Sequence, residues 1–164
     1  METNTLLTVA ADQGPHLSVV GDTYRLVITG EQTNGAYAVI DMLIPPNGGP
    51  GPHAHPNFQE SFYVLDGEVE VKTESETYIA RKGSFLNIPT GGMVHCFKNK
   101  SDQVAHLWCM VVPAGLDEFF QEIGTPVAAN TFLPPPPMGP DDIKRLEAIA
   151  QKYGQQVFPP DYLG

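Results

Sequence analysis

Four side chains combine the residue types and the spacing that bind a transition metal ion: His53, His55, Glu60 and His95. His53 and His55 are two positions apart, so both imidazoles lie on one face of a strand, because successive side chains alternate. Three neutral imidazoles and one carboxylate form a ligand set for borderline divalent ions. The sequence therefore predicts one divalent transition metal ion, and iron, manganese, nickel, cobalt, copper and zinc all stay open.

The remaining histidines and the two cysteines are expected to have structural roles. We interpret His16 and His106 as hydrogen-bonded structural residues. Cys96 follows His95 directly, so strand alternation points its thiol away from the metal site. Cys96 and Cys109 form neither a disulfide framework nor a CxxC site, and we expect free thiols.

The elements that must position these ligands are short strands. The chain of 164 residues has 16 glycines and 16 prolines, and only 17% of its residues are charged, a composition that favours strands joined by turns. Asp66-Gly67 between two β-prone runs predicts a hairpin. We expect strands over residues 23–29, 36–44, 61–65, 68–73, 77–80, 85–88, 94–98 and 104–112.

The pattern changes after Pro113. Apolar residues from Leu116 to Ile123 recur at helical spacing, which predicts one short amphipathic helix. Residues 134–137 are four prolines, expected to form an extended linker. A second, longer helix is predicted from Pro140 to Tyr153. We thus expect a single all-β domain over residues 1–164, with a barrel over about 6–113 and the helices and proline-rich strap over 114–164.

The net charge of the protein limits the classes of partner that it can bind. The formal net charge is −10, and such an acidic surface repels nucleic acids and anionic membranes. No apolar run approaches the ~18 residues of a spanning helix. No basic residue precedes Arg25, so a signal peptide is not expected. We predict a cytoplasmic protein that binds a small molecule, with no nucleic-acid or membrane partner.

The first ligand segment resembles a sequence motif of the cupin superfamily. That motif places His-x-His, a Glu and then a Gly at fixed spacings, and His53, His55, Glu60 and Gly67 match it. The glycine that opens the family motif is replaced by Asn47 here. The departure lies in a glycine-rich turn and leaves the ligand positions unchanged.

The second ligand segment resembles the second cupin motif. Gly83, Pro89, His95 and Asn99 match it, with one extra residue between Pro89 and Gly92. The resemblance covers about residues 35–113 and implies a jelly-roll barrel. It also implies that His95 completes the metal ligand set.

A narrower resemblance, to single-barrel quercetin 2,3-dioxygenase-like cupins, rests on residues 62–68 and 113–120. It implies a metal-dependent dioxygenase-like enzyme that acts on a small aromatic or enolisable substrate, and a homodimer. Two alternatives stay open. One is an isomerase or lyase that uses the same metal without oxygen, and the other is a binding module without turnover.

Glu60 is the expected catalytic residue, because it is the one ligand that can both bind the ion and accept a proton from a substrate hydroxyl. Side-chain alternation along the strands suggests candidates for the substrate pocket. Phe62 is two residues from Glu60, and Met93 and Phe97 are each two residues from His95, so these side chains are expected on the same faces as the ligands. We expect Phe62, Met93 and Phe97 to line the pocket above the metal.

Overall fold

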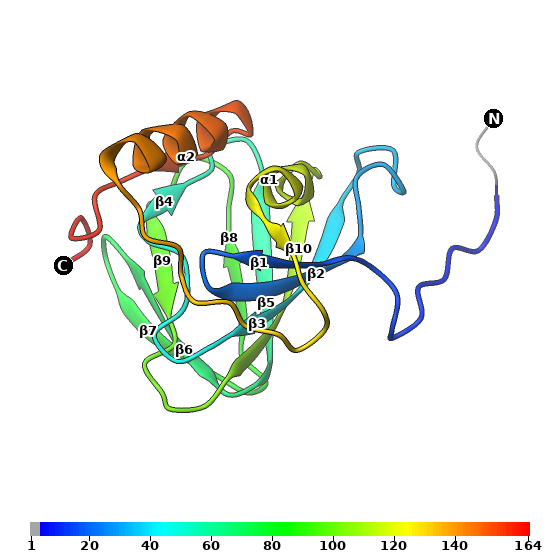
Figure 1. The fold of residues 1–164 in the computed structure, drawn as a ribbon, viewed down its shortest axis with the longest axis horizontal. Helices are drawn as coiled ribbons and strands as arrows, with labels where there is room; N and C mark the ends of the chain where they lie inside the picture. Colours follow the sequence, from blue (N-terminus) through cyan, green and yellow to red (C-terminus); the bar gives the residue numbers. More distant parts are fainter. Residues whose placement is uncertain (1–3) are drawn as a thin grey trace.

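Two antiparallel sheets face each other and form a barrel (Figure 1). The computed structural model describes residues 4–164. The seven-stranded sheet contains, in spatial order, β11 (Thr125–Pro126), β1 (His16–Val19), β2 (Asp22–Ile28), β3 (Ala38–Ile44), β10 (Ala105–Val112), β5 (Gln59–Asp66) and β8 (Phe85–Ile88). The five-stranded sheet contains β12 (Gln156–Val157), β4 (His53–Ala54), β9 (His95–Lys98), β6 (Glu68–Thr73) and β7 (Thr77–Arg81). The predicted all-β jelly-roll class is confirmed.

Side-chain alternation places the core between the two sheets. In β5, Glu60, Phe62 and Val64 are buried, whereas Tyr63 between them is exposed. β10 crosses the centre of its sheet, with Leu107 opposite Met42 on one side and Val64 on the other. This pleating turns one face of each strand inward, and Glu60 reaches an apolar interior because it shares that face.

The eight predicted strands correspond to observed strands whose ends lie within two residues of the predicted ones. β1, β11 and β12 fall outside the predicted ranges, and β4 covers only His53–Ala54 of the strand expected through His55. Three of these four strands are two residues long. Such strands exist because a distant segment supplies their hydrogen bonds, so they carry no periodicity of their own.

Two helices cover one end of the barrel (Figure 1). α1 (Leu116–Ile123) packs its buried face, with Leu116, Phe119 and Phe120, against the core. α2 (Pro140–Lys152) begins with the predicted proline in its first turn, and its Ala150 is buried. Both helices occur where the sequence predicts them. No helix in the described part of the chain is long and apolar enough to cross a membrane.

The segment between the helices packs on its own chain. The Thr23 hydroxyl donates a hydrogen bond to the carbonyl of Thr131, 2.6 Å away. Gly21 has a φ of 97°, and a side chain there would meet Pro135 at 2.9 Å. A glycine is therefore required where the proline run crosses the β1–β2 turn. The run is an extended connection that holds α2 over the mouth of the barrel.

Candidate metal centre

The structure brings the four predicted ligands together from three strands and one loop. His53 begins β4 and pairs with His95, which begins β9. His55 follows β4, and Glu60 reaches in from β5 of the opposite sheet. The ligand atoms of His53, His55, Glu60 and His95 all lie within 4.8 Å of one another. The cluster fits a divalent metal site.

Backbone carbonyls fix the orientation of all three imidazoles. Each Nδ1 lies at hydrogen-bond distance from a carbonyl oxygen two or three residues away: His53 from Gly51 at 2.9 Å, His55 from Phe58 at 3.0 Å, and His95 from Met93 at 2.9 Å. A carbonyl only accepts, so each Nδ1 must carry the hydrogen. Each neutral imidazole then presents an unprotonated Nε2 to the centre, which is the arrangement that orients histidine ligands toward a metal.

The facing nitrogen atoms need a cation between them. His55 Nε2 lies 3.2 Å from His95 Nε2 and 3.1 Å from Glu60 Oε2. With the hydrogens on Nδ1, these atoms are all acceptors whose lone pairs converge. Ligand atoms each ~2.1 Å from one ion lie roughly 3 to 4 Å apart, which matches these separations. The donor set itself therefore calls for a positive ion at this point.

Burial and mutual charge set the protonation states of the ligands. Burial lowers the pKa of His53, and burial together with the charge of His53 lowers that of His95 to about 3. Burial opposes the charge on Glu60, but the hydrogen bond that a protonated His55 donates to it, together with the other imidazoles, brings its pKa below the usual range. Burial also opposes the charge on His55, but the same contact with Glu60 outweighs it and raises the pKa of His55. A metal ion would take the place of this proton, because an ionised carboxylate beside neutral imidazoles is the state that binds a metal.

Cys109 holds the second oxygen of Glu60. Its thiol lies 3.2 Å from Glu60 Oε1 and donates a hydrogen bond to it. Burial and the neighbouring carboxylate raise the pKa of Cys109 well above its usual value, so the thiol stays protonated. Cys96, beside His95, is only partly buried. The role of Cys109 depends on the pairing of β10 with β5, a long-range contact that residue spacing does not reveal.

The metal centre opens onto a cavity of about 570 Å³ between the barrel and the two helices. His53 and Glu60 form part of its wall. Most of the remaining lining is apolar and includes Phe97, Leu116, Phe119 and Phe120. A cavity of this size and character is typical of a site for a small organic molecule.

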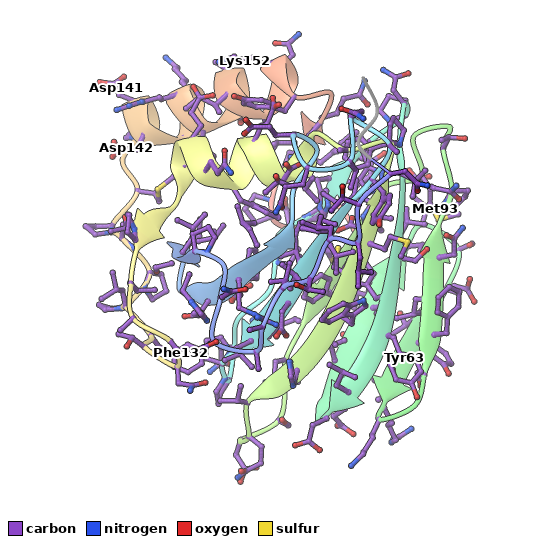
Figure 2. All side chains as sticks on the ribbon, turned by 90° about the vertical axis from the view of Figure 1, so that its right-hand side faces the viewer. Tyr63, Met93, Phe132, Asp141, Asp142 and Lys152 are labelled. Atoms are coloured by element: carbon purple, nitrogen blue, oxygen red, sulfur yellow. The ribbon has the colours of Figure 1, made fainter. Side chains whose placement is uncertain are left out.

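The three predicted pocket residues differ in their positions. Phe97 lines the large cavity. Phe62 packs edge to face against Phe97, with ring centroids 5.4 Å apart, and borders only a void of about 10 Å³ beside His95. Met93 is 42% exposed on the outside of the barrel and lines neither of these spaces in the described chain (Figure 2). The expectation for Met93 is wrong because β9 begins at His95, so strand alternation does not extend back to residue 93.

The cavity also contains a buried acid that the sequence did not reveal. Asp22 is 3% exposed, and its carboxylate accepts hydrogen bonds from the Tyr24 hydroxyl at 2.8 Å and from the backbone N–H of Gly49 at 3.2 Å. Burial raises the pKa of Asp22 to about 6. Asp22 and Tyr24 share one face of β2 and both line the cavity. Asp22 was missed because the predicted strand begins one residue later.

His106 lies outside the site and has a structural partner. Its Nε2 is hydrogen-bonded to the carboxylate of Asp41 on the neighbouring strand β3. The contact raises the pKa of His106, mainly through the hydrogen bond to Asp41. His106 thus has the kind of role that the sequence predicts for it.

A model of the cupin domain family matches residues 40–112, a range that contains all four ligand candidates. Residues 40–112 thus form a cupin domain. The predicted resemblance is thereby confirmed. The motif spacings, the converging imidazoles and the barrel all agree with this assignment.

Among curated proteins, this cupin is similar to quercetin 2,3-dioxygenases. It is 25% identical over 120 residues to the one from Bacillus subtilis (strain 168), covering 73% of this chain and 35% of that protein. It is 25% identical over 125 residues to the one from Aspergillus japonicus, covering 72% and 35%. The chain thus spans about a third of the length of these two relatives.

Among solved structures, KdgF from Halomonas sp. superimposes with a TM-score of 0.59. The two chains are 17% identical, and the match covers 70% of this cupin and 99% of KdgF. At this identity the likeness supports the shared fold.

Proposed function

We propose that this cupin is a metal-dependent, dioxygenase-like enzyme that acts on a small aromatic or enolisable substrate. One observation carries the proposal. Two of the four clustered ligand residues, His53 and Glu60, lie in the wall of a largely apolar cavity. The similarity to quercetin 2,3-dioxygenases supports the same class of chemistry. His53, His55, Glu60 and His95 would hold the ion.

The charge of the cavity supports an uncharged, apolar substrate. No lysine or arginine is among the residues that line it in the described structure, and its acidic side chains are Asp22, Glu60 and Glu147. A phosphorylated substrate would lack a basic partner there and would face several carboxylates. A neutral compound avoids this repulsion. It becomes an anion only at the oxygen that it presents to the metal centre.

Glu60 is placed to take the proton from that oxygen. It lies in the wall of the cavity, its Oε2 faces the imidazoles and its Oε1 is held by the Cys109 thiol. When bound, the ion would supply Lewis acidity toward the substrate oxygen and, if redox-active, electron transfer with dioxygen. Transfer of the hydroxyl proton to Glu60 leaves an enolate, and the surrounding aromatic side chains exclude water from it.

The test combines metal analysis with oxygen consumption. Protein purified without chelators should contain about one transition metal ion per chain, measured by mass spectrometry. Quercetin added in air should then be consumed together with dioxygen. Consumption of quercetin without dioxygen would favour an isomerase or lyase. Metal and ligand binding without turnover would favour a binding module, and the absence of metal after reconstitution would overturn the catalytic proposal.

We also propose a cytoplasmic homodimer formed by one domain per chain. Tyr63 and Phe85 are cross-strand neighbours on the outer face of the larger sheet, 44% and 65% exposed, and Met110 is 40% exposed on the same sheet. Such residues favour an interface between copies, and closed twofold dimers are the commonest oligomers. Sedimentation should give about twice the chain mass of 17.8 kDa, and a monomer would contradict the dimer.

A further inference from the structure

The loop between β3 and β4 leads directly into the first metal ligand. The carbonyl oxygen of Gly51, near its end, lies 2.9 Å from His53 Nδ1 and orients that imidazole. At its start, the Asn47 N–H donates to the carbonyl of Asn99, and the Asn99 N–H donates to that of Gly48. The loop contains no helix or strand, so its shape depends on individual contacts of this kind.

The buried carboxylate of Asp22 holds the middle of this loop. Its Oδ1 accepts a hydrogen bond from the Gly49 N–H at 3.2 Å, and its Oδ2 accepts one from the Tyr24 hydroxyl at 2.8 Å. Asp22 begins β2 in the larger sheet, whereas the loop leads into β4 in the smaller sheet. The contact therefore connects the two sheets beside the metal centre.

Close packing confines the loop around this hydrogen bond. Gly49 has a φ of 117°, and a side chain there would meet the carbonyl oxygen of Phe97 at 2.1 Å. A side chain at Gly48 would meet Asp22 Oδ1 at 2.5 Å. Phe97 lies two residues after His95 in β9. The loop is thus enclosed between Asp22 and the strand of a second metal ligand, and only glycine fits there.

We propose that Asp22 is a positioning residue of the metal centre, because its hydrogen bond to the Gly49 N–H fixes the loop whose Gly51 carbonyl orients His53. The inference goes beyond the proposed reaction, since it concerns the binding of the ion and no substrate. Groups that orient a histidine ligand change metal affinity by about 10- to 100-fold. Asp22 acts through the loop, so we expect an effect at the lower end of that range.

A second buried aspartate provides a matched comparison. Asp117 is 1% exposed, and its carboxylate accepts hydrogen bonds from the backbone N–H groups of Gly30 at 2.8 Å and Gly115 at 3.0 Å. Neither glycine lies in a segment that leads into a metal ligand. Asp117 therefore shares the burial and the type of contact of Asp22, but it has no such connection to His53.

The first experiment is a Co²⁺ titration, in which the visible absorption bands report the geometry around the ion. Asp22→Leu removes the acceptor for Gly49, so it should weaken Co²⁺ binding by about tenfold and change these bands. Asp22→Asn keeps an oxygen that accepts from Gly49 and should stay within about twofold of the wild-type affinity. Asp117→Leu should match the wild-type protein in both affinity and spectrum.

Several outcomes would overturn the role of Asp22. One is a folded Asp22→Leu protein with wild-type affinity and spectrum. Equal losses in Asp22→Leu and Asp117→Leu would assign the effect to general stability, and equal losses in Asp22→Leu and Asp22→Asn would assign it to charge. If the wild-type protein binds no Co²⁺, the metal centre fails and this role fails with it. The titration contains no substrate, so the proposed reaction can fail while all these expectations hold.

Amide hydrogen exchange of the wild-type protein tests the same link without a substitution, which matters if Asp22→Leu does not fold. Coupling between two sites is reciprocal, so an ion that depends on the Gly49 contact must also stabilise that contact. Saturating Zn²⁺ should therefore slow exchange of the Gly49 N–H by about tenfold more than exchange of the Gly30 N–H, which Asp117 holds. Equal slowing at both glycines would show that the ion stabilises only the whole fold, and it would overturn the proposal.

Discussion

The Nε2 atoms of His55 and His95 face each other at 3.2 Å, while the Nδ1 atom of each ring is hydrogen-bonded to a backbone carbonyl. Neither Nε2 therefore carries a hydrogen when the rings are neutral, and their lone pairs repel each other. A cation between them converts this repulsion into coordination. The bonds from Nδ1 to the backbone carbonyls keep both Nε2 atoms directed at the same point. They also tie each ring to the loop beside its strand.

Replacing His95 with alanine should remove the metal. The substitution deletes one of four converging ligands and leaves its neighbours with too few donors to hold the ion. We expect the metal content, measured by mass spectrometry, to fall from about one ion per chain to less than about a tenth. His106→Ala should keep the ion, because His106 bonds Asp41 outside the site. Equal metal content in both variants would contradict the ligand assignment.

Glu60→Gln should separate binding of the ion from turnover. The amide oxygen can still face the ion, but glutamine cannot accept the substrate proton. Turnover of quercetin should fall by about a hundredfold or more, whereas part of the metal is retained. Steady-state kinetics normalised to metal content provide the measurement. A variant with undiminished turnover per metal ion would remove the base role from Glu60.

A substitution of Cys109 should preserve the metal centre only when the new side chain can donate a hydrogen bond to Glu60. Cys109→Ala deletes the hydrogen bond to Glu60 Oε1, so the carboxylate loses its anchor. We expect metal affinity or turnover to fall by about tenfold, and Cys109→Ser to recover most of the loss. Cys96→Ala is the matched control, because Cys96 is partly exposed and does not contact Glu60. If alanine and serine behave alike at residue 109, the hydrogen bond has no role.

The buried Asp22 should make stability depend on pH. Its pKa is about 6 in the folded protein, against 3.8 for an unburied aspartate. Between these values only the folded state keeps the proton, so the free energy of unfolding falls as pH rises from about 4 to 6. The amide introduced by Asp22→Asn does not titrate and can still pair with the Tyr24 hydroxyl.

Urea unfolding of the metal-free proteins tests this linkage. Relative to wild type, Asp22→Asn should gain about 2 kcal/mol in free energy of unfolding between pH 4 and pH 7. The buried histidines titrate in both proteins and largely cancel from the difference. Parallel stability curves over this range would show that Asp22 does not titrate there.

The sequence by itself determined the ligand set and most strands. The two-residue spacing of His53 and His55 predicts that their imidazoles converge, and they do, although β4 ends at Ala54. The Asp66-Gly67 turn connects β5 to β6, but the predicted hairpin is wrong because these two strands lie in different sheets and do not pair. The helices were predictable for a similar reason, since the spacing of Leu116 and its apolar partners is local. These features follow from interactions between near neighbours in the chain.

Only the tertiary structure decided what surrounds the metal centre. Cys109 reaches Glu60 because β10 pairs with β5, and Val157 lies opposite His53 because β12 pairs with β4 about a hundred residues earlier in the chain. Met93 lies outside because its strand starts two residues later. Register between distant strands depends on packing across the whole core, and no local repeat encodes it. The chemistry of the ligands is therefore local in sequence, whereas the selectivity of the cavity is a product of the fold.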